Sequence, residues 1–331
     1  MPSALIAPSP PGTGPFLWLA ALLLGMPALI PAAWGAKSVE LFRLGFSYSM
    51  LADVNENDAK ASLRALSAVI SSEHGIQANP DPMLFQGTEP IARALLAGEV
   101  DAVTITADEY WVLHPQVSFS RFLVGGQETD PREEYLLLVR RDSGLATLSD
   151  LTGRRLALHA VPRMRLGYLW LEVQLARDGL PPAAVCFAHA QKSSKLSKVV
   201  LDVFFKQADA CLVTRNGFAA MSEMNPQVGK QLVVLAASPA LVPSFFAFRS
   251  GLSDAYVGRI IQEFKDVQRT PAGRQALTIF QVGALRELPG SSMDPAMAML
   301  DEYRRLRPEA ANRLVTLLQS NAGNLMGGSE P

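Results

Sequence analysis

Charged residues are scarce in this sequence, and neither sign prevails. They make up 18% of the 331 residues, and the 30 basic and 31 acidic side chains leave a formal net charge of -1. A chain so close to neutrality has no general electrostatic attraction for nucleic acid or for an anionic lipid surface. We therefore expect no nucleic-acid partner, and any charged ligand must be attracted by a few local groups.

Histidine, cysteine and the common catalytic motifs are also sparse. No G-x-S-x-G turn, P-loop or G-x-G-x-x-G motif occurs. The two cysteines lie inside apolar runs, where a nucleophilic thiol is not expected. The histidines show no spacing typical of metal ligands; they are His74, His114, His159 and His189. His159 and His189 could meet at one strand edge, but we predict neither an enzyme nor a bound metal or cofactor.

The first 35 residues contain no Lys, Arg, Asp or Glu. An apolar stretch at residues 16–30 is followed by small residues, with Ala33 and Gly35 at the two positions that a signal peptidase requires to be small. A membrane anchor is the alternative, but the stretch is shorter than the roughly 20 residues that cross a bilayer. It is also interrupted by Gly25 and Pro27. We expect residues 1–35 to be a cleaved signal peptide and the protein to be periplasmic.

After Ala36 the sequence alternates between strand and helix patterns. Such an alternation predicts an α/β fold with mainly parallel sheets covered on both faces. Strands are expected at 41–47, 82–86, 101–106, 119–124, 135–140, 155–159, 185–189, 208–214, 231–236 and 244–248. Helices are expected at 57–72, 89–97, 166–177, 195–206, 253–269, 271–280, 295–307 and 308–317.

Two segments of the chain echo each other. Residues 91–106 and 199–214 each read as a helix, then an aspartate, then a buried strand. The aspartates are Asp101 and Asp209. The occurrence of this pattern at the same place in both halves suggests two similar lobes.

Four segments carry a resemblance to a known family. They are residues 42–47, residues 91–103, the run Leu148-Ser149-Asp150-Leu151-Thr152-Gly153-Arg154-Arg155-Leu156-Ala157, and the helix–strand pair that ends at 208–210. With the order of elements, they make the chain resemble the periplasmic phosphate, phosphite and phosphonate binding proteins of ABC transporters, of the type 2 solute-binding fold. The resemblance implies two lobes around a central cleft, each with strand order 2-1-3, and two crossing strands near 140–141 and 240–244.

The expected domains follow from that resemblance. Residues 36–140 and 241–331 would form lobe 1, and residues 141–240 would form lobe 2. The partners it implies are a small-molecule anion and a transporter permease, although the same fold can report to a membrane sensor protein instead. Proteins of this type are expected to be monomers.

The strand order also bears on Cys186 and Cys211. A disulfide is possible in an exported protein. The resemblance places the two cysteines on strands separated by a third, and strands lie about 4.8 Å apart. The sulfurs would then be too distant to bond, so we expect two small buried side chains.

Ligands of open α/β sheets bind beyond the carboxyl ends of the strands, where loops lead into helix N-termini. The loops at that edge supply the candidate ligand-binding residues. In lobe 1 they are Ser47, Tyr48, Ser49, Thr88, Thr106 and Tyr110, and in lobe 2 they are Arg163, Arg165, Ser193, Ser194 and Thr214. Each has a structural alternative as a turn, a helix cap or a solvated side chain.

The turn after the first strand of lobe 2 departs from the family. Where relatives carry a Ser-Thr-Ser-Gly-like stretch, this chain carries Arg163 and Arg165. Guanidinium groups suit oxyanions in general. The ligand could therefore be phosphate-like or phosphonate-like, or it could be a sulfonate or a carboxylate. Four acidic residues argue against a purely anionic site, because they could hold an amino group of a zwitterion or face water. They are Asp53, Glu56, Asp108 and Glu109.

Overall fold

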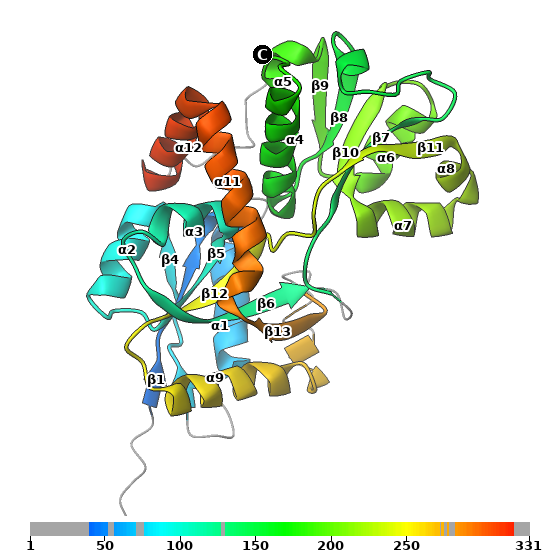
Figure 1. Ribbon diagram of the computed structural model, residues 1–331. Coiled ribbons are helices and arrows are strands. Elements are labelled where there is room, and N and C mark those ends of the chain that lie inside the picture. The colour runs from blue at the N-terminus through cyan, green and yellow to red at the C-terminus, as the bar shows by residue number, and fades with distance from the viewer. Residues whose placement is uncertain are drawn as a thin grey trace, which may run out of the picture. The chain divides into compact units, whose positions relative to one another are not determined.

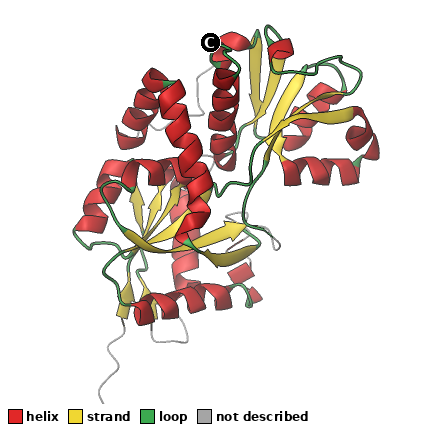
Figure 2. Ribbon diagram, in the orientation of Figure 1, coloured by secondary structure: helices red, strands yellow, loops and turns green. Residues whose placement is uncertain are grey.

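The computed structural model describes residues 40–51, 56–70, 76–126, 130–271, 273–274, 277 and 282–320 (Figure 1). The expected signal peptide, residues 1–35, lies outside the described residues. A small parallel pair joins β1 (Glu40–Phe42) to β3 (Ile76–Ala78). The remaining described strands form two larger sheets, and helices flank both of them (Figure 2). No helix within the described ranges is long and apolar enough to cross a membrane.

The first sheet has the strand order β13-β6-β12-β5-β2-β4. Its three parallel strands are β4 (Met83–Phe85), β2 (Leu44–Ser47) and β5 (Ala102–Thr106), which confirms the predicted order 2-1-3. Every residue of β2 and β5 is buried, as expected for strands covered on both faces. Antiparallel strands β12 (Ser244–Arg249), β6 (Phe119–Gly126) and β13 (Ala284–Leu288) complete the sheet.

The second sheet has the order β11-β7-β10-β8-β9. Its parallel strands are β10 (Ala210–Thr214), β8 (Arg155–His159) and β9 (His189–Ser193), so the order 2-1-3 is confirmed here too. The strand expected at 185–189 lies later, because residues Ala183–Cys186 form the short helix α5 after Pro182. β7 (Tyr135–Arg140) pairs antiparallel with β10 on one side and with β11 (Leu232–Ala237) on the other.

The first expected crossing, near Arg140 and Arg141, is displaced by one strand. β7 belongs to the second sheet, so the chain leaves the first sheet between β6 and β7. The apolar run of β7 is buried on both faces and would suit either sheet, which is why its pattern did not decide the matter. The second expected crossing ends where β12 begins. We propose lobe boundaries at these two crossings in place of residues 140 and 241.

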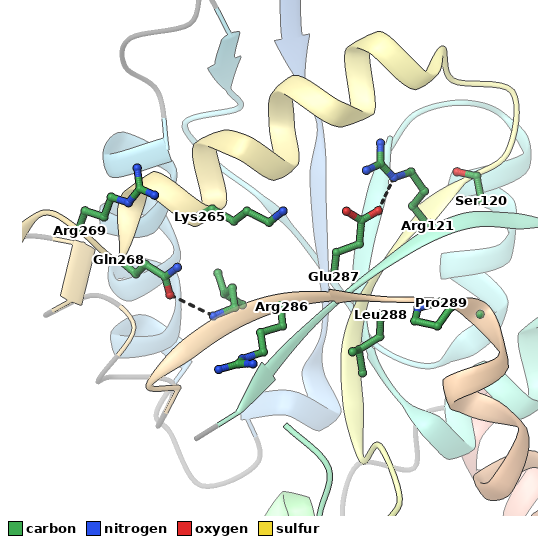
Figure 3. A pocket seen from close by; sticks show the side chains of 11 residues that line it. Ser120, Arg121, Lys265, Gln268, Arg269, Arg286, Glu287, Leu288 and Pro289 are labelled. Atoms are coloured by element: carbon green, nitrogen blue, oxygen red, sulfur yellow. Dashed lines mark hydrogen bonds and ion pairs between the residues drawn. The ribbon is translucent and has the colours of Figure 1, made fainter. Parts of the chain in front are cut away.

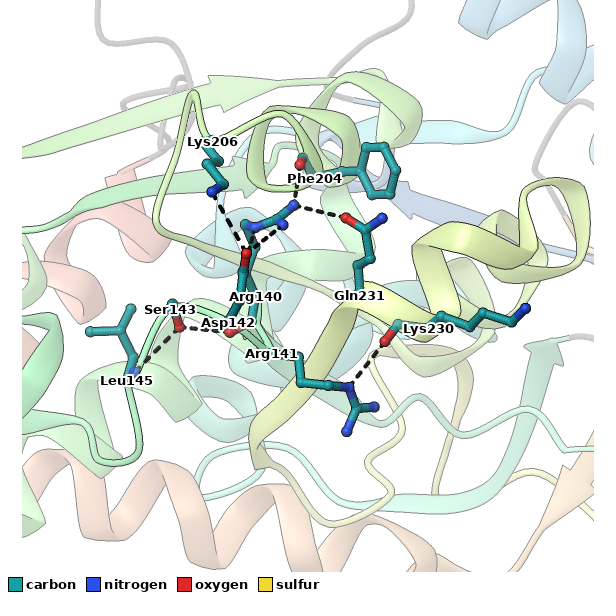
Figure 4. A network of polar contacts seen from close by, with 9 residues as sticks. All are labelled: Arg140, Arg141, Asp142, Ser143, Leu145, Phe204, Lys206, Lys230 and Gln231. Carbon is teal, nitrogen blue, oxygen red and sulfur yellow. Dashed lines mark hydrogen bonds and ion pairs between the residues drawn. The ribbon is translucent and has the colours of Figure 1, made fainter.

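Side-chain hydrogen bonds hold the carboxyl end of β7 in the second sheet (Figure 4). Arg140 binds Asp142 through two nitrogens, at 2.8 and 2.9 Å. It also donates to Gln231 at 3.0 Å and to the carbonyl of Phe204. These bonds tie β7 to α6 (Leu196–Phe204) and to α8 (Pro226–Gln231), so this end of β7 is built into the second sheet.

Two C-terminal helices pack on both halves. α11 (Asp294–Leu306) contacts α4 (Arg165–Arg177) beside the second sheet and α3 (Ala107–Leu113) beside the first, while α12 (Pro308–Ser320) packs on α2 (Thr88–Leu96). Apolar residues of both halves join one core cluster that includes Trp170, Leu300 and Tyr303. The other described helices of four or more residues are α1 (Glu56–Ile70), α7 (Arg215–Met224), α9 (Asp254–Val267), η1 (Tyr48–Leu51) and η4 (Gly290–Met293).

The two cysteines are free and buried, as predicted, but the argument for it was partly wrong. Cys186 ends helix α5 and does not lie on a strand, whereas Cys211 lies on β10. Burial raises the pKa of the Cys211 thiol. A buried, protonated thiol packs as a small apolar side chain and is a poor nucleophile.

Candidate functional site

The carboxyl ends of the parallel strands carry the predicted site residues. Ser47 ends β2 and Thr106 ends β5, while Arg163 and Arg165 follow β8. Ser193 and Thr214 end β9 and β10. The short helix η1 after β2 contacts η3 (Pro162–Met164) after β8, so residues 47–51 and 162–165 of the two halves come together.

A buried carboxylate organises the edge of the first sheet. Glu109 is 1% exposed and accepts the hydroxyl of Ser47 at 2.5 Å. Its other oxygen accepts the backbone N–H of Thr106 at 2.9 Å and the Thr106 hydroxyl at 3.0 Å. The contact to the backbone is half of a capping box, because Glu109 is the third residue of α3 and reaches back to the residue before that helix. The hydroxyls of Ser47 and Thr106, which we predicted to bind the ligand, therefore already donate to the Glu109 carboxylate.

The other predicted residues of the first half have mixed surroundings. Ser49 donates its backbone N–H to the Ser47 hydroxyl at 3.2 Å, and Tyr48 is partly exposed in η1. Thr88 is buried as the first residue of α2, and the preceding Gly87 holds the N-cap position with φ of 88°. The expectation that Thr88 caps the helix is therefore wrong, because the chain turns at a residue where only glycine is unstrained.

Tyr110 lies on α3 as part of an aromatic cluster. Its ring is 5.3 Å from that of Phe245 and 5.6 Å from that of Phe122, centroid to centroid. Burial raises the pKa of its hydroxyl. The ring packs in the core while the side chain stays partly exposed, so the structure gives Tyr110 a packing role in addition to any contact with a ligand.

The two arginines of the second half both reach carboxylates. Arg165, the first residue of α4, pairs with Asp108, the second residue of α3. The Asp108 side chain is 1% exposed and that of Arg165 is 12% exposed. This ion pair joins a helix that follows the first sheet's β5 to a helix that follows the second sheet's β8.

Arg163 lies against the crossing segments. Its guanidinium is 3.3 Å from the carboxylate of Glu133 and donates to the carbonyl of Gly125 at 3.3 Å. The Tyr135 hydroxyl donates to the carbonyl of Arg163 at 2.7 Å. Glu133 pairs with Leu241 of the returning segment, and burial raises its pKa, opposed by the positive charge of Arg163.

Ser193, Ser194 and Thr214 serve local structure at the other strand ends. The Ser193 hydroxyl accepts the backbone N–H of Lys195 at 3.1 Å. Thr214 caps α7 by accepting the N–H of Gly217 at 3.1 Å. The carbonyl of Ser194 lies 3.3 Å from Nε2 of His159. The hydrogen bonds of these three residues lie at the ends of β8, β9 and β10, whereas Arg163 and Arg165 bind the carboxylates of Glu133 and Asp108.

Sequence reasoning placed Asp108 and Glu109 near this edge, but it missed Glu133 and the partners of all three carboxylates. The spacing of Thr106 and Glu109 is a T-x-x-E capping signature, which predicts the local contact of Glu109. No local pattern predicts that Glu133 meets Arg163 or that Asp108 meets Arg165. The first pair is separated by 30 residues along the chain and the second by 57.

A cavity of about 730 Å³ lies elsewhere, between α9, β6 and β13 (Figure 3). Arg121 binds Glu287 at 2.5 Å there, and Gln268 accepts the backbone N–H of Leu285 at 3.3 Å. Its lining contains none of the predicted site residues. Across the described ranges, no group of three or more His, Cys, Asp or Glu side chains is arranged to hold a metal ion.

Chemically, the described residues of the site combine charged side chains with hydroxyls. The described groups are hydroxyls, guanidiniums and carboxylates that bind one another. Burial lowers the pKa of His159, opposed by the hydrogen bond with Ser194. Such an arrangement can recognise a small charged molecule, and recognition by charged hydrogen bonds is strongest where water is excluded.

Comparisons with known proteins agree with that picture. The sequence matches the family described as "ABC transporter, phosphonate, periplasmic substrate-binding protein" over residues 48–289. No curated protein sequence matches the chain.

Among solved structures, XAC2383 from Xanthomonas citri, bound to ATP, has 20% identity and a TM-score of 0.55, covering 81% of this chain and 98% of that one. A binding protein component of an ABC phosphonate transporter from Pseudomonas aeruginosa, PA3383, has 16% identity and a TM-score of 0.50, covering 84% and 95%. PhnD1 from Prochlorococcus marinus, in complex with methylphosphonate, has 13% identity and a TM-score of 0.50, covering 80% and 97%. At these identities the likeness establishes the fold.

The fold is therefore that of a two-lobed α/β periplasmic binding protein, with two mixed sheets flanked by helices. A protein of this class binds a solute and is not an enzyme. Since the family match covers well over half of its residues, the chain belongs to the periplasmic substrate-binding proteins of phosphonate ABC transporters.

Proposed function

We propose that this protein captures a small oxyanion of the phosphate, phosphite or phosphonate type outside the cytoplasm and delivers it to an ABC importer. The observation that carries the proposal is the position of Arg165. It begins α4 at the carboxyl edge of the second sheet and points at the equivalent edge of the first. Family membership and the methylphosphonate bound by PhnD1 support the ligand class.

The proposed binding residues are those that converge at these edges. Arg165 would supply a planar pair of donors to the oxyanion, which suits a guanidinium better than an ammonium group. Tyr48 and Ser49 would join it, because they lie on η1, which contacts η3 just before Arg165. Arg163 would support the site without contacting the ligand, because its guanidinium binds Glu133 and the carbonyl of Gly125 at the crossing.

The proposed partner is a membrane permease, and the proposed location is the periplasm after removal of residues 1–35. A membrane sensor protein could take the permease's place on the same binding-protein surface. A monomer suffices for either role, because both halves of the site come from one chain.

A second ligand class is favoured by one observation. The turn at 162–165 offers two guanidiniums where the family carries hydroxyls, and a guanidinium binds a sulfonate or carboxylate as readily as a phosphonate. The ligand would then be a sulfonate or carboxylate captured at the same place.

A thermal-shift screen tests the proposal. The purified protein is melted with phosphate, phosphite, methylphosphonate, 2-aminoethylphosphonate, sulfate, taurine and simple carboxylates. A ligand that binds only the folded state stabilises it by about 2.7 kcal/mol at 100 times its dissociation constant. We expect one phosphorus oxyanion to raise the melting temperature, and Arg165→Ala to abolish that rise.

Arg154→Ala is the matched control. Arg154 is an exposed arginine of the same half that donates to the carbonyl of Asp150, away from the site. Its loss should leave the shift intact. A shift with sulfate, taurine or a carboxylate alone would favour the second ligand class. No shift with any of these compounds would contradict the proposed capture of a small anion.

A further inference from the structure

We propose that Asp108 is a built-in competitor for the ligand. Its carboxylate occupies the place beside Arg165 that the ligand's oxyanion takes, so Asp108 sets how tightly each anion binds. This inference rests on the proposed function, because it assigns a role to a residue of the same site.

The first observation is that an anion already fills the site. A carboxylate and a phosphonate both present oxygens to a guanidinium in one plane. Arg165 has its charge matched by Asp108 at a position where both side chains are largely buried. An incoming anion therefore meets a neutral pair, and it gains the full attraction of Arg165 only when Asp108 gives way.

The second observation is that Asp108 is incompletely bonded. Oδ2 of Asp108 accepts from Arg165, but Oδ1 is buried and has no hydrogen-bond partner among the described residues. A buried carboxylate oxygen without a donor is costly. The pair is therefore less well satisfied than one built only for stability.

Two other aspartates of this protein show what a structural pair looks like. Asp101 accepts from the backbone and guanidinium of Arg43 with both oxygens. Asp209 does the same for Arg155. In contrast with these, Asp108 accepts from only one nitrogen of Arg165. A ligand that offers several oxygens can replace such a contact more easily than it can replace a two-oxygen pair.

A selectivity follows from the exchange. An anion with a single accepting oxygen replaces one hydrogen bond by another and gains little. A phosphonate with three oxygens can bind Arg165 with two of them and still accept a further donor. The competitor therefore favours multi-oxygen anions and weakens the binding of all anions relative to an unopposed arginine.

The test is the substitution Asp108→Asn, which keeps the shape and removes the charge. Methylphosphonate and sulfate are titrated into the wild type and the variant by calorimetry. We expect the variant to bind methylphosphonate about tenfold or more tightly, since close charge pairs couple by about 1.5 kcal/mol or more. Glu302→Gln is the control, because it removes a carboxylate bound to Arg177 on α4 at 2.6 and 2.7 Å, without touching Arg165. The control should leave the affinity unchanged.

The outcomes separate this inference from the proposed function. Equal or weaker binding of methylphosphonate by Asp108→Asn overturns the competitor role and leaves the proposed function standing. Tighter sulfate binding by the variant, with no methylphosphonate binding by either protein, supports the competitor and overturns the phosphonate assignment. If neither the wild type nor the folded variant binds either anion, both the inference and the proposed function are contradicted.

A second variant covers loss of folding. Asp108→Ser removes the carboxylate but keeps a small polar side chain in the first turn of α3, and it is titrated in the same way. If neither variant folds, Asp108 is required for the structure itself. A ligand could then not replace its contact, and the competitor role is overturned.

Discussion

Asp101 and Asp209 make the same contacts in the two halves of the molecule. Each precedes the third parallel strand of its sheet, and each accepts the backbone N–H and the guanidinium of the arginine that precedes or begins the first. The partners are Arg43 and Arg155. The strands are also in matching register, with Leu44 opposite Ala102 and Leu156 opposite Ala210. The sequence echo thus corresponds to a repeated ion pair.

The two aspartates differ in burial, which predicts different costs of removal. Asp101 is 2% exposed and also binds Arg249 at 3.3 Å, so Asp101→Asn should destabilise the protein by about 3 kcal/mol. The Asp209 pair is more open to water, and Asp209→Asn should cost about 1 kcal/mol. Urea denaturation of both variants measures the two costs. Equal costs, or a larger one for Asp209→Asn, would show that burial does not set the strength of this motif.

Two helical glycines should respond in opposite directions to alanine. A Cβ on Gly167 of α4 would lie 2.7 Å from Cδ1 of Tyr135, whose ring is fully buried. Gly167→Ala should therefore destabilise the protein by about 1–3 kcal/mol through overpacking. A Cβ on Gly258 of α9 would meet nothing closer than 3.6 Å, so Gly258→Ala should stabilise by about 0.5–1 kcal/mol through helix propensity. Thermal melts compare the pair, and a neutral Gly167→Ala would contradict the packing of α4 on Tyr135.

Glu133 should give the stability a distinctive pH dependence. Burial raises its pKa above the ordinary value of 4.5, so the folded state binds a proton more tightly than the unfolded chain does. The contribution of Glu133 to stability is then greatest below pH 4.5 and falls as the pH rises from there through the raised pKa. Paired carboxylates such as Asp209, whose pKa is lowered by its hydrogen bonds with Arg155, act in the opposite sense at lower pH.

The variant Glu133→Gln isolates this contribution. We expect the difference in unfolding free energy, wild type minus variant, to decline as the pH rises above 4.5 and then to level off. Chemical denaturation at a series of pH values measures it. A difference that grows with pH over that interval would mean that the ion pair with Arg163 outweighs the burial of Glu133.

Export predicts a defined amino terminus. Protein recovered from the periplasm of an expressing bacterium should begin at Ala36, because Ala33 and Gly35 are the small residues before that bond. Amino-terminal sequencing or intact mass measures it. Recovery of the full-length chain in the membrane fraction would instead support the alternative of a retained anchor.

Much of the fold was accessible from the sequence, because its parallel strands are short apolar runs bounded by turns. β2, β5, β8 and β10 were placed in this way, and their order followed from the family resemblance. The sheet to which β7 belongs was not accessible, since a run buried on both faces fits either sheet. β9 was misplaced because it is an exposed edge strand with polar residues, while the apolar run before it forms α5.

The candidate site was accessible only in part. The rule that ligands bind beyond strand ends selected Ser47, Thr106 and Arg165, and the structure places all three at those ends. The rule does not predict hydrogen-bond partners, so it did not show that Glu109 accepts hydrogen bonds from the hydroxyls of Ser47 and Thr106. Contacts between residues far apart in the chain depend on how the two sheets come together, and no local pattern encodes that.

The most direct test of the central claim is a crystal structure grown with the oxyanion that stabilises the protein most. The account predicts that the anion lies against the guanidinium of Arg165, between η1 and the start of α4, and that the carboxylate of Asp108 has moved off Arg165. An anion bound elsewhere, for instance among Arg121 and Lys265 in the cavity beside α9, with the Arg165–Asp108 pair intact, would contradict it.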